Sequence, residues 1–138
     1  MEFSQQQARE LVNIEEGTFV YWSKLMPRLR HLKGKGRRFK LADVLALGVL
    51  SIAVRELGCN IAHLAPSADV LFDMCHGMSI DEASKKILLF NGSGRCEVRT
   101  ELPLERELGV GAIVVRLALL VERMTNQMES DQYRLPLN

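Results

Sequence analysis

The sequence predicts a mainly α-helical protein with small β-hairpins. Apolar residues recur every three or four positions over several stretches, which is the spacing of one face of an α-helix. Two other stretches place glycines between short extended arms, which is typical of β-hairpins. The chain has 138 residues, of which 47% are hydrophobic and 25% charged. That composition is ordinary for a globular protein and allows one core of usual size or two small ones.

Two short helices are expected first. Ser4 can cap a helix over residues 5–12, and the polar Asn13 ends it. A second helix begins at Ile14 to Glu16 and ends before Pro27, with apolar side chains at helical spacing. Two helices joined by so short a turn make a helix-turn-helix candidate.

A strongly basic segment follows these helices. Between Lys24 and Lys40 there are eight Lys or Arg residues and no carboxylate, although the whole chain has a net charge of only +1. Residues 1–40 carry nine basic against four acidic residues, and residues 41–138 carry nine against thirteen. The two glycines within residues 32–41 predict a basic hairpin. Such a segment on a nearly neutral chain indicates a polyanionic partner, and the alternative is a solvated basic loop.

The remaining elements follow from apolar periodicity and turn residues. A helix is expected over residues 41–57 and another over residues 61–75, with Pro66 near the start of the second or kinking it. A hairpin is expected over residues 86–100, around Gly-Ser-Gly. The last stripe, from Val110 to Met128, predicts a helix of about five turns.

The order of helix, turn, helix, basic hairpin and long helix is that of a winged helix-turn-helix domain. Five stretches carry a more specific pattern: Phe3-Ser-Gln-Gln-Gln-Ala-Arg-Glu-Leu-Val-Asn-Ile, Thr18-Phe-Val-Tyr-Trp22, Gly36-Arg-Arg-Phe39, Ala42-Asp-Val-Leu-Ala-Leu47 and Arg55-Glu-Leu-Gly58. In this ordered series residues 3–64 resemble the N-terminal DNA-binding domain of the MerR (mercury-resistance regulator) family.

The resemblance implies a sequence-specific transcriptional regulator of bacterial or phage type that binds operator or promoter DNA as a homodimer. The second helix would enter the major groove and the basic wing would lie on the backbone. The residues expected at DNA are Thr18, Tyr21, Lys24, Arg28, Lys33, Lys35, Arg37, Arg38 and Lys40. Trp22 is expected in the core. Family members commonly carry arginine where this chain has Gly17 and Val20, so specificity is expected to depend on the wing or on DNA shape.

The expected organisation has three parts. Residues 1–77 would form the DNA-binding domain, residues 78–130 a dimerisation or regulatory region with hairpin and C-terminal helix, and residues 131–138 a flexible tail. A homodimer is expected because two linked copies gain effective concentration on DNA. The side chains expected at the dimer seam are Ile113, Leu117, Leu120 and Met124. The alternative packs this last helix on the hairpin of its own chain.

The expected partners are double-stranded DNA, a second copy of the chain and RNA polymerase, with no membrane partner. The apolar runs are short and the N-terminus lacks the pattern of a signal peptide, so we expect a cytoplasmic, nucleoid-associated protein. No phosphate loop or nucleophile elbow occurs, so neither an enzyme nor a cofactor is expected. Cysteines and histidines lack close paired spacing, so no metal site is expected. The alternative function is an architectural or excisionase-like nucleoprotein-assembly protein, or a protein-interaction module. Activator and repressor stay equally open.

Overall fold

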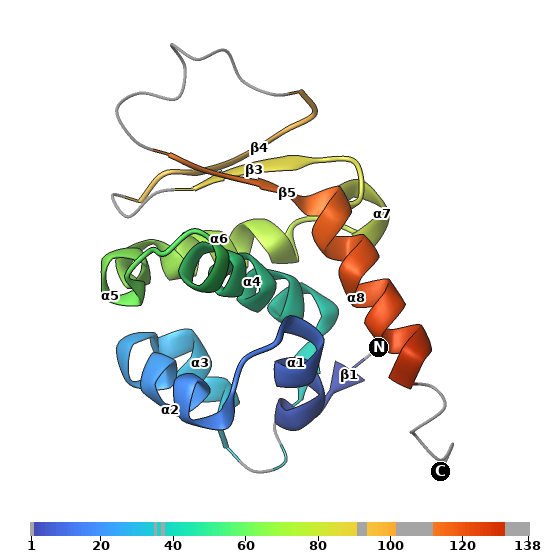
Figure 1. The fold of residues 1–138 in the computed structure, drawn as a ribbon. Coiled ribbons are helices and arrows are strands. Elements are labelled where there is room, and N and C mark those ends of the chain that lie inside the picture. The colour runs from blue at the N-terminus through green and yellow to red at the C-terminus, as the bar shows by residue number, and fades with distance from the viewer. Residues whose placement is uncertain (1, 35, 37, 91–93, 102–111, 132–138) are drawn as a thin grey trace.

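The computed structural model describes residues 2–34, 36, 38–90, 94–101 and 112–131. The protein is mainly helical, with one two-stranded and one three-stranded antiparallel sheet. Figure 1 shows three layers: the three-stranded sheet at one end, α4 and α6 beneath it, and α1, α2 and α3 at the other end. Helix α8 runs from the sheet along one side toward α1. Nothing in the described part of the chain is a helix long and apolar enough to span a membrane.

The N-terminal elements are β1 (Glu2–Phe3), α1 (Gln5–Val12) and α2 (Glu16–Leu25). Ser4 caps α1 as the sequence predicts: its Oγ accepts the Gln7 backbone N–H at 3.1 Å, and Gln7 Oε1 accepts the Ser4 N–H at 2.9 Å. Asn13 ends α1 in the left-handed conformation, with φ of 59°. Both expected helices are therefore confirmed.

The expected basic hairpin over residues 32–41 is wrong. Its start belongs to a further helix, α3 (Pro27–Leu32), which begins with proline at a position where a fixed φ and a missing N–H favour helix formation. Strand β2 (Phe39–Lys40) pairs with β1, so Phe39 lies opposite Phe3 and Lys40 opposite Glu2. The N-terminal strand thus takes the place that the first arm of the hairpin would have had.

The centre of the molecule is helical. Its elements are α4 (Leu41–Ser51), the π-helical turn η1 (Ile52–Glu56), α5 (Ile61–Leu64), the 3₁₀ turn η2 (Ala65–Ser67) and α6 (Ala68–His76). Every residue of α4 from Asp43 onward is buried, as expected for a helix surrounded by other elements. Pro66 falls in η2 and separates α5 from α6, which confirms the expected interruption.

The C-terminal elements are α7 (Ile80–Ala83), β3 (Ile87–Phe90), β4 (Cys96–Arg99), β5 (Ile113–Arg116) and α8 (Leu117–Asp131). Antiparallel pairing of β3 with β4 confirms the second hairpin, whose turn at residues 91–93 lies outside the described residues. The expected start of the last helix is wrong, because Ile113–Arg116 forms a strand that pairs with β3. The apolar spacing of so short a run fits both a helix and a strand. Its residues Ile-Val-Val are β-branched, which favours the strand that completes the sheet. The expected tail from residue 132 onward also lies outside the described residues.

One hydrophobic cluster joins the expected DNA-binding region to the C-terminal elements. Helix α8 packs against α1 and α4, and the contact with α4 is close because Gly48 has no side chain. A Cβ added at Gly48 would lie 2.9 Å from Leu120 Cδ1 and 3.2 Å from Val12 Cγ1. The sheet packs on α6 through β4, and Leu88 and Phe90 of β3 are buried in the same cluster.

Candidate nucleic-acid interface

Exposed basic side chains gather at the end of the molecule opposite the three-stranded sheet. Figure 1 places α2 and α3 at this end. Lys24, Lys33, Arg38 and Lys40 are all exposed there. Lys35 and Arg37, which were also expected at DNA, lie outside the described residues.

An aromatic contact fixes the end of the basic segment to α2. The rings of Phe19 on α2 and Phe39 on β2 meet edge to face, with centroids 5.8 Å apart and an interplanar angle of 63°. Both side chains are completely buried. Because Lys40 follows Phe39 directly in the same strand, its position relative to α2 is set by this contact and by the pairing with β1. We call the basic chain from Lys33 to Lys40 the basic segment.

The outer face of α2 carries hydroxyl and ammonium groups. Thr18, Tyr21 and Lys24 follow one another at the three-residue spacing that keeps side chains on one side of a helix. Tyr21 is 50% exposed and Lys24 is exposed, whereas Thr18 is half-buried. The opposite face buries Phe19 and Trp22, so the expected core position of Trp22 is confirmed.

The N-terminal end of α2 is acidic instead. Glu15 and Glu16 are exposed there, and a carboxylate close to phosphate is repelled. The middle and C-terminal end of α2 is consequently the part suited to a polyanion.

Arg28 has a partner within the chain. Its Nη1 lies 2.7 Å from Asp73 Oδ1, and its guanidinium stands over the Phe72 ring at 5.5 Å from the centroid. These contacts join α3 to α6. Arg28 thus has partners within the chain, and its expected contact with DNA stays a prediction.

Arg30, which the sequence analysis did not single out, caps the end of α2. Its Nη2 donates to the Lys24 carbonyl at 2.8 Å and its Nε to the Ser23 carbonyl at 3.3 Å. These are carbonyls that a helix leaves without internal partners. Arg30 is exposed and adds a positive charge beside Lys24. Its place in the basic run was visible in the sequence, but its capping role depends on α3 turning back toward α2.

A buried carboxylate fixes the exit of the basic segment. Asp43 Oδ2 accepts the Lys40 backbone N–H at 2.9 Å, and Oδ1 lies 2.7 Å from His76 Nε2. Arg38 Nη2 donates weakly to the Glu2 carbonyl at 3.4 Å. The C-terminal end of the basic segment is therefore held by α4, α6 and β1, while the side chains of Arg38 and Lys40 stay exposed.

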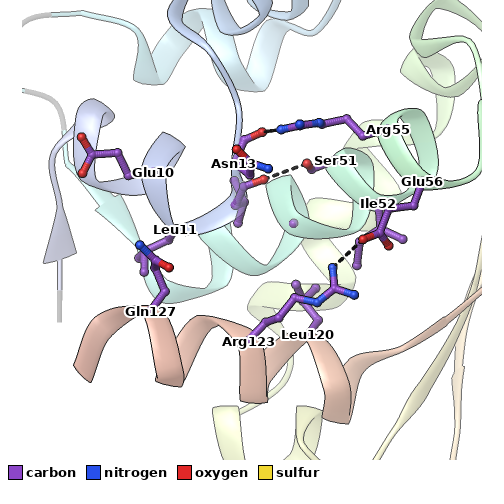
Figure 2. Close-up of a pocket in the computed structure, with 12 residues that line it drawn as sticks. Glu10, Leu11, Asn13, Ser51, Ile52, Arg55, Glu56, Leu120, Arg123 and Gln127 are labelled. Carbon is purple, nitrogen blue, oxygen red and sulfur yellow. Dashed lines mark hydrogen bonds and ion pairs between the residues drawn. The ribbon is translucent and has the colours of Figure 1, made fainter. Parts of the chain in front are cut away.

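A hollow of about 430 Å³ lies between α1, η1 and α8 (Figure 2). Arg55 donates to the Asn13 carbonyl, and Ser51 Oγ donates to the Val12 carbonyl at 2.7 Å. On the other side Arg123 Nη1 meets Glu56 Oε1 at 2.8 Å. The bonds from Arg55 and Ser51 hold the chain at the end of α1, and the Arg123–Glu56 pair joins α8 to η1.

The cysteines give no sign of a metal centre. Burial raises the pKa of the Cys75 thiol to about 12 and that of Cys96 to about 11, so both are protonated at neutral pH, whereas metals bind thiolates. Within the ranges that the structure describes, no three His, Cys, Asp or Glu side chains are grouped so that they could hold a metal ion.

The residues expected at the dimer seam lie inside their own chain. Leu117, Leu120 and Met124 are buried on the face of α8 that meets the core, and Ile113 is half-buried in β5. The exposed face of α8 carries Leu119 among polar residues. A dimer interface formed by these buried side chains would require α8 to separate from α1 and α4.

No protein family, curated protein or solved structure matches this chain. The candidate interface is accordingly defined by its own geometry: the exposed face of α2, the exposed basic side chains after it, and the Phe19–Phe39 contact that holds them together.

Proposed function

We propose that this protein binds double-stranded DNA as a MerR-like winged helix-turn-helix transcriptional regulator, acting in the cytoplasm at operator or promoter sites. The observation that carries the proposal is the Phe19–Phe39 contact, which holds the basic segment against α2. A helix fits the major groove, and a basic chain fixed beside it can meet the adjacent phosphates. In this arrangement the β1–β2 pair, with the chain leading into it, takes the role of the wing.

The proposed contacts fall into two groups. Lys24, Lys33, Arg38 and Lys40 contact phosphates, which strengthens binding without selecting a sequence. Tyr21 and Thr18 place hydroxyls on the groove side of α2, where they can reach phosphate or a base edge. Gly17 and Val20 offer no hydrogen-bonding side chain, so DNA shape and deformability supply much of the specificity.

Selection of bound sequences from a random duplex pool, followed by gel shifts at several salt concentrations, tests the proposal. A regulator enriches a defined motif and binds it more tightly than random DNA. An architectural protein binds all duplexes with the same steep salt dependence. A purified protein that binds no duplex even at low salt would refute both forms.

A matched pair of variants locates the interface. Lys40→Ala removes a charge from the basic segment, whereas Lys85→Ala removes an exposed lysine beside the sheet, where it pairs with Asp81. We expect Lys40→Ala to weaken binding and to lower the slope of log affinity against log salt by about 0.9, the value for one phosphate contact. Lys85→Ala should change neither. Equal effects of the two variants would refute the assignment.

A further inference from the structure

Strand β4 is an edge of the three-stranded sheet. The strand order is β4-β3-β5, so β4 hydrogen-bonds to β3 on one side, and no strand of the described ranges pairs with its other side. An unpaired edge presents backbone donors and acceptors that can pair with another strand.

The charges along this edge alternate in sign. Arg95, Glu97, Arg99 and Glu101 occupy every second position of the sequence. Glu97 and Arg99 lie within β4 and share one face, whereas Arg95 directly precedes the strand and Glu101 follows it in a bend. Glu97 Oε1 accepts from Arg95 Nη2 at 2.6 Å and from Arg99 Nη2 at 3.3 Å. These hydrogen bonds and charges lower the pKa of Glu97, the bond from Arg95 most of all, so Glu97 is ionised at neutral pH. The other face of β4 carries Val98, which packs toward the core.

We propose that two copies of this protein associate through β4, paired antiparallel about Val98, so that the two sheets become one six-stranded sheet. In this register Glu97 lies opposite Arg99 of the second copy, and continued pairing beyond the strand ends would place Arg95 opposite Glu101 of the second copy. Twofold symmetry repeats the Glu97–Arg99 pair, which gives two contacts between opposite charges within the paired strands and none between like charges. Val98 meets its own copy on the core side.

The charges select this register over its neighbours. A slip of two residues in one direction places Arg95 opposite Arg99 and Glu97 opposite itself. In the other direction it places Glu97 opposite Glu101 and Arg99 opposite itself. Like charges directly opposite each other destabilise a strand pair. A slip of one residue would turn the core face of one copy to the solvent face of the other.

The proposed pairing also fixes how the two copies are oriented. Residues directly opposite each other in an antiparallel pair lie on the same face of the sheet. The helices of both copies therefore lie on the same side of the joined sheet. The end of each copy that carries α2 then points away from the sheet in the same direction (Figure 1). A twofold pair of this kind suits two half-sites on one duplex. That last step rests on the proposed function, whereas the association itself does not.

Other surfaces of the described chain are less suited to self-pairing. The apolar stripe of α8 is buried against α1 and α4. Strand β5 is the other edge of the sheet, but Ile113–Arg116 carries one charge and no alternating pattern that would select a register.

Charge reversal tests the pairing by sedimentation velocity, without DNA. Wild type should be a dimer at micromolar concentration. Glu97→Arg and Arg99→Glu each turn two attractive pairs into two repulsive ones, which should weaken association by roughly thirtyfold. An equimolar mixture of these two variants should form a heterodimer, because a chain positive at both positions then faces a chain negative at both. The double variant Glu97→Arg with Arg99→Glu should dimerise by itself.

The control is Glu122→Arg, which reverses an exposed charge on α8 and should leave the dimer intact. A wild type that stays monomeric at its highest soluble concentration would overturn the proposal. Single variants that dimerise like wild type would also overturn it. The same holds for a mixture of the single variants that fails to associate, provided that circular dichroism shows the double variant to be folded. Since no DNA is present, a protein that dimerises as expected but binds no duplex would refute only the proposed function.

Discussion

Truncating Leu120 to alanine should show that α8 is part of the chain's own core. Leu120 is 4% exposed and fills the space that Gly48 leaves on α4. Leucine to alanine removes three carbon atoms, and burial of each contributes about 0.8 kcal/mol, so the transfer term is about 2.4 kcal/mol. The term for an empty cavity should be small, because Leu120 also lines the 430 Å³ hollow and water can enter the new space.

We therefore expect Leu120→Ala to lower the free energy of unfolding by about 2.5 kcal/mol in urea, with an unchanged slope. The control is its neighbour Leu119, which is 55% exposed and whose change to alanine should cost less than about 0.5 kcal/mol. The loss should be independent of protein concentration, as for an intrachain contact. Equal losses for the two variants, or dissociation of a dimer by Leu120→Ala without loss of monomer stability, would place Leu120 at a seam between chains.

Three further outcomes follow from the same contacts. Gly48→Ala should destabilise the fold by about 1–3 kcal/mol in urea unfolding, because its Cβ would lie 2.9 Å from Leu120 Cδ1. The double variant with Leu120→Ala should recover part of that loss, and additive losses would contradict the close approach. Arg28→Ala should lower stability while leaving the salt slope of DNA binding unchanged, because its guanidinium binds Asp73; a slope reduced by about 0.9 would place Arg28 at the interface. The unfolding free energy of wild type, relative to that of Cys75→Ala, should fall as pH rises from about 8 to 10.5. Burial raises the folded-state pKa of this thiol from 9.0 to about 12, so the thiol ionises first in the unfolded chain and stabilises that state. A difference in unfolding free energy that stays constant with pH would argue against a buried, protonated thiol.

The local signals in the sequence were sufficient for most helices. Ser4 and Asn13 set the limits of α1 because capping depends on residues within one turn. The hairpin of β3 and β4 followed in the same way, because its two arms are close together in the sequence with glycines between them. Exposure of the basic segment could also be expected, because a run of like charges without carboxylates is seldom buried.

The errors have a common cause, which is a partner far away in the chain. Strand β2 pairs with β1, more than thirty residues earlier, so the glycines of the basic segment suggested a local hairpin instead. Strand β5 pairs with β3, although residues 91–112 separate the two strands in the sequence, and the apolar spacing of its residues fitted a helix equally well. The ion pair of Arg28 could not be predicted for the same reason, since Asp73 lies 45 residues further on.

Two charge patterns in this chain have different physical consequences. Between Lys24 and Lys40 all formal charges have one sign, so this segment attracts a polyanion and repels its own copy. Between Arg95 and Glu101 the signs alternate, so the charges cancel at a distance and match only an antiparallel copy. A charge removed from the first pattern should therefore alter DNA binding and leave self-association unchanged. A charge reversed in the second should weaken self-association, and the loss of DNA affinity that follows from losing the dimer should disappear when the complementary variant restores the dimer.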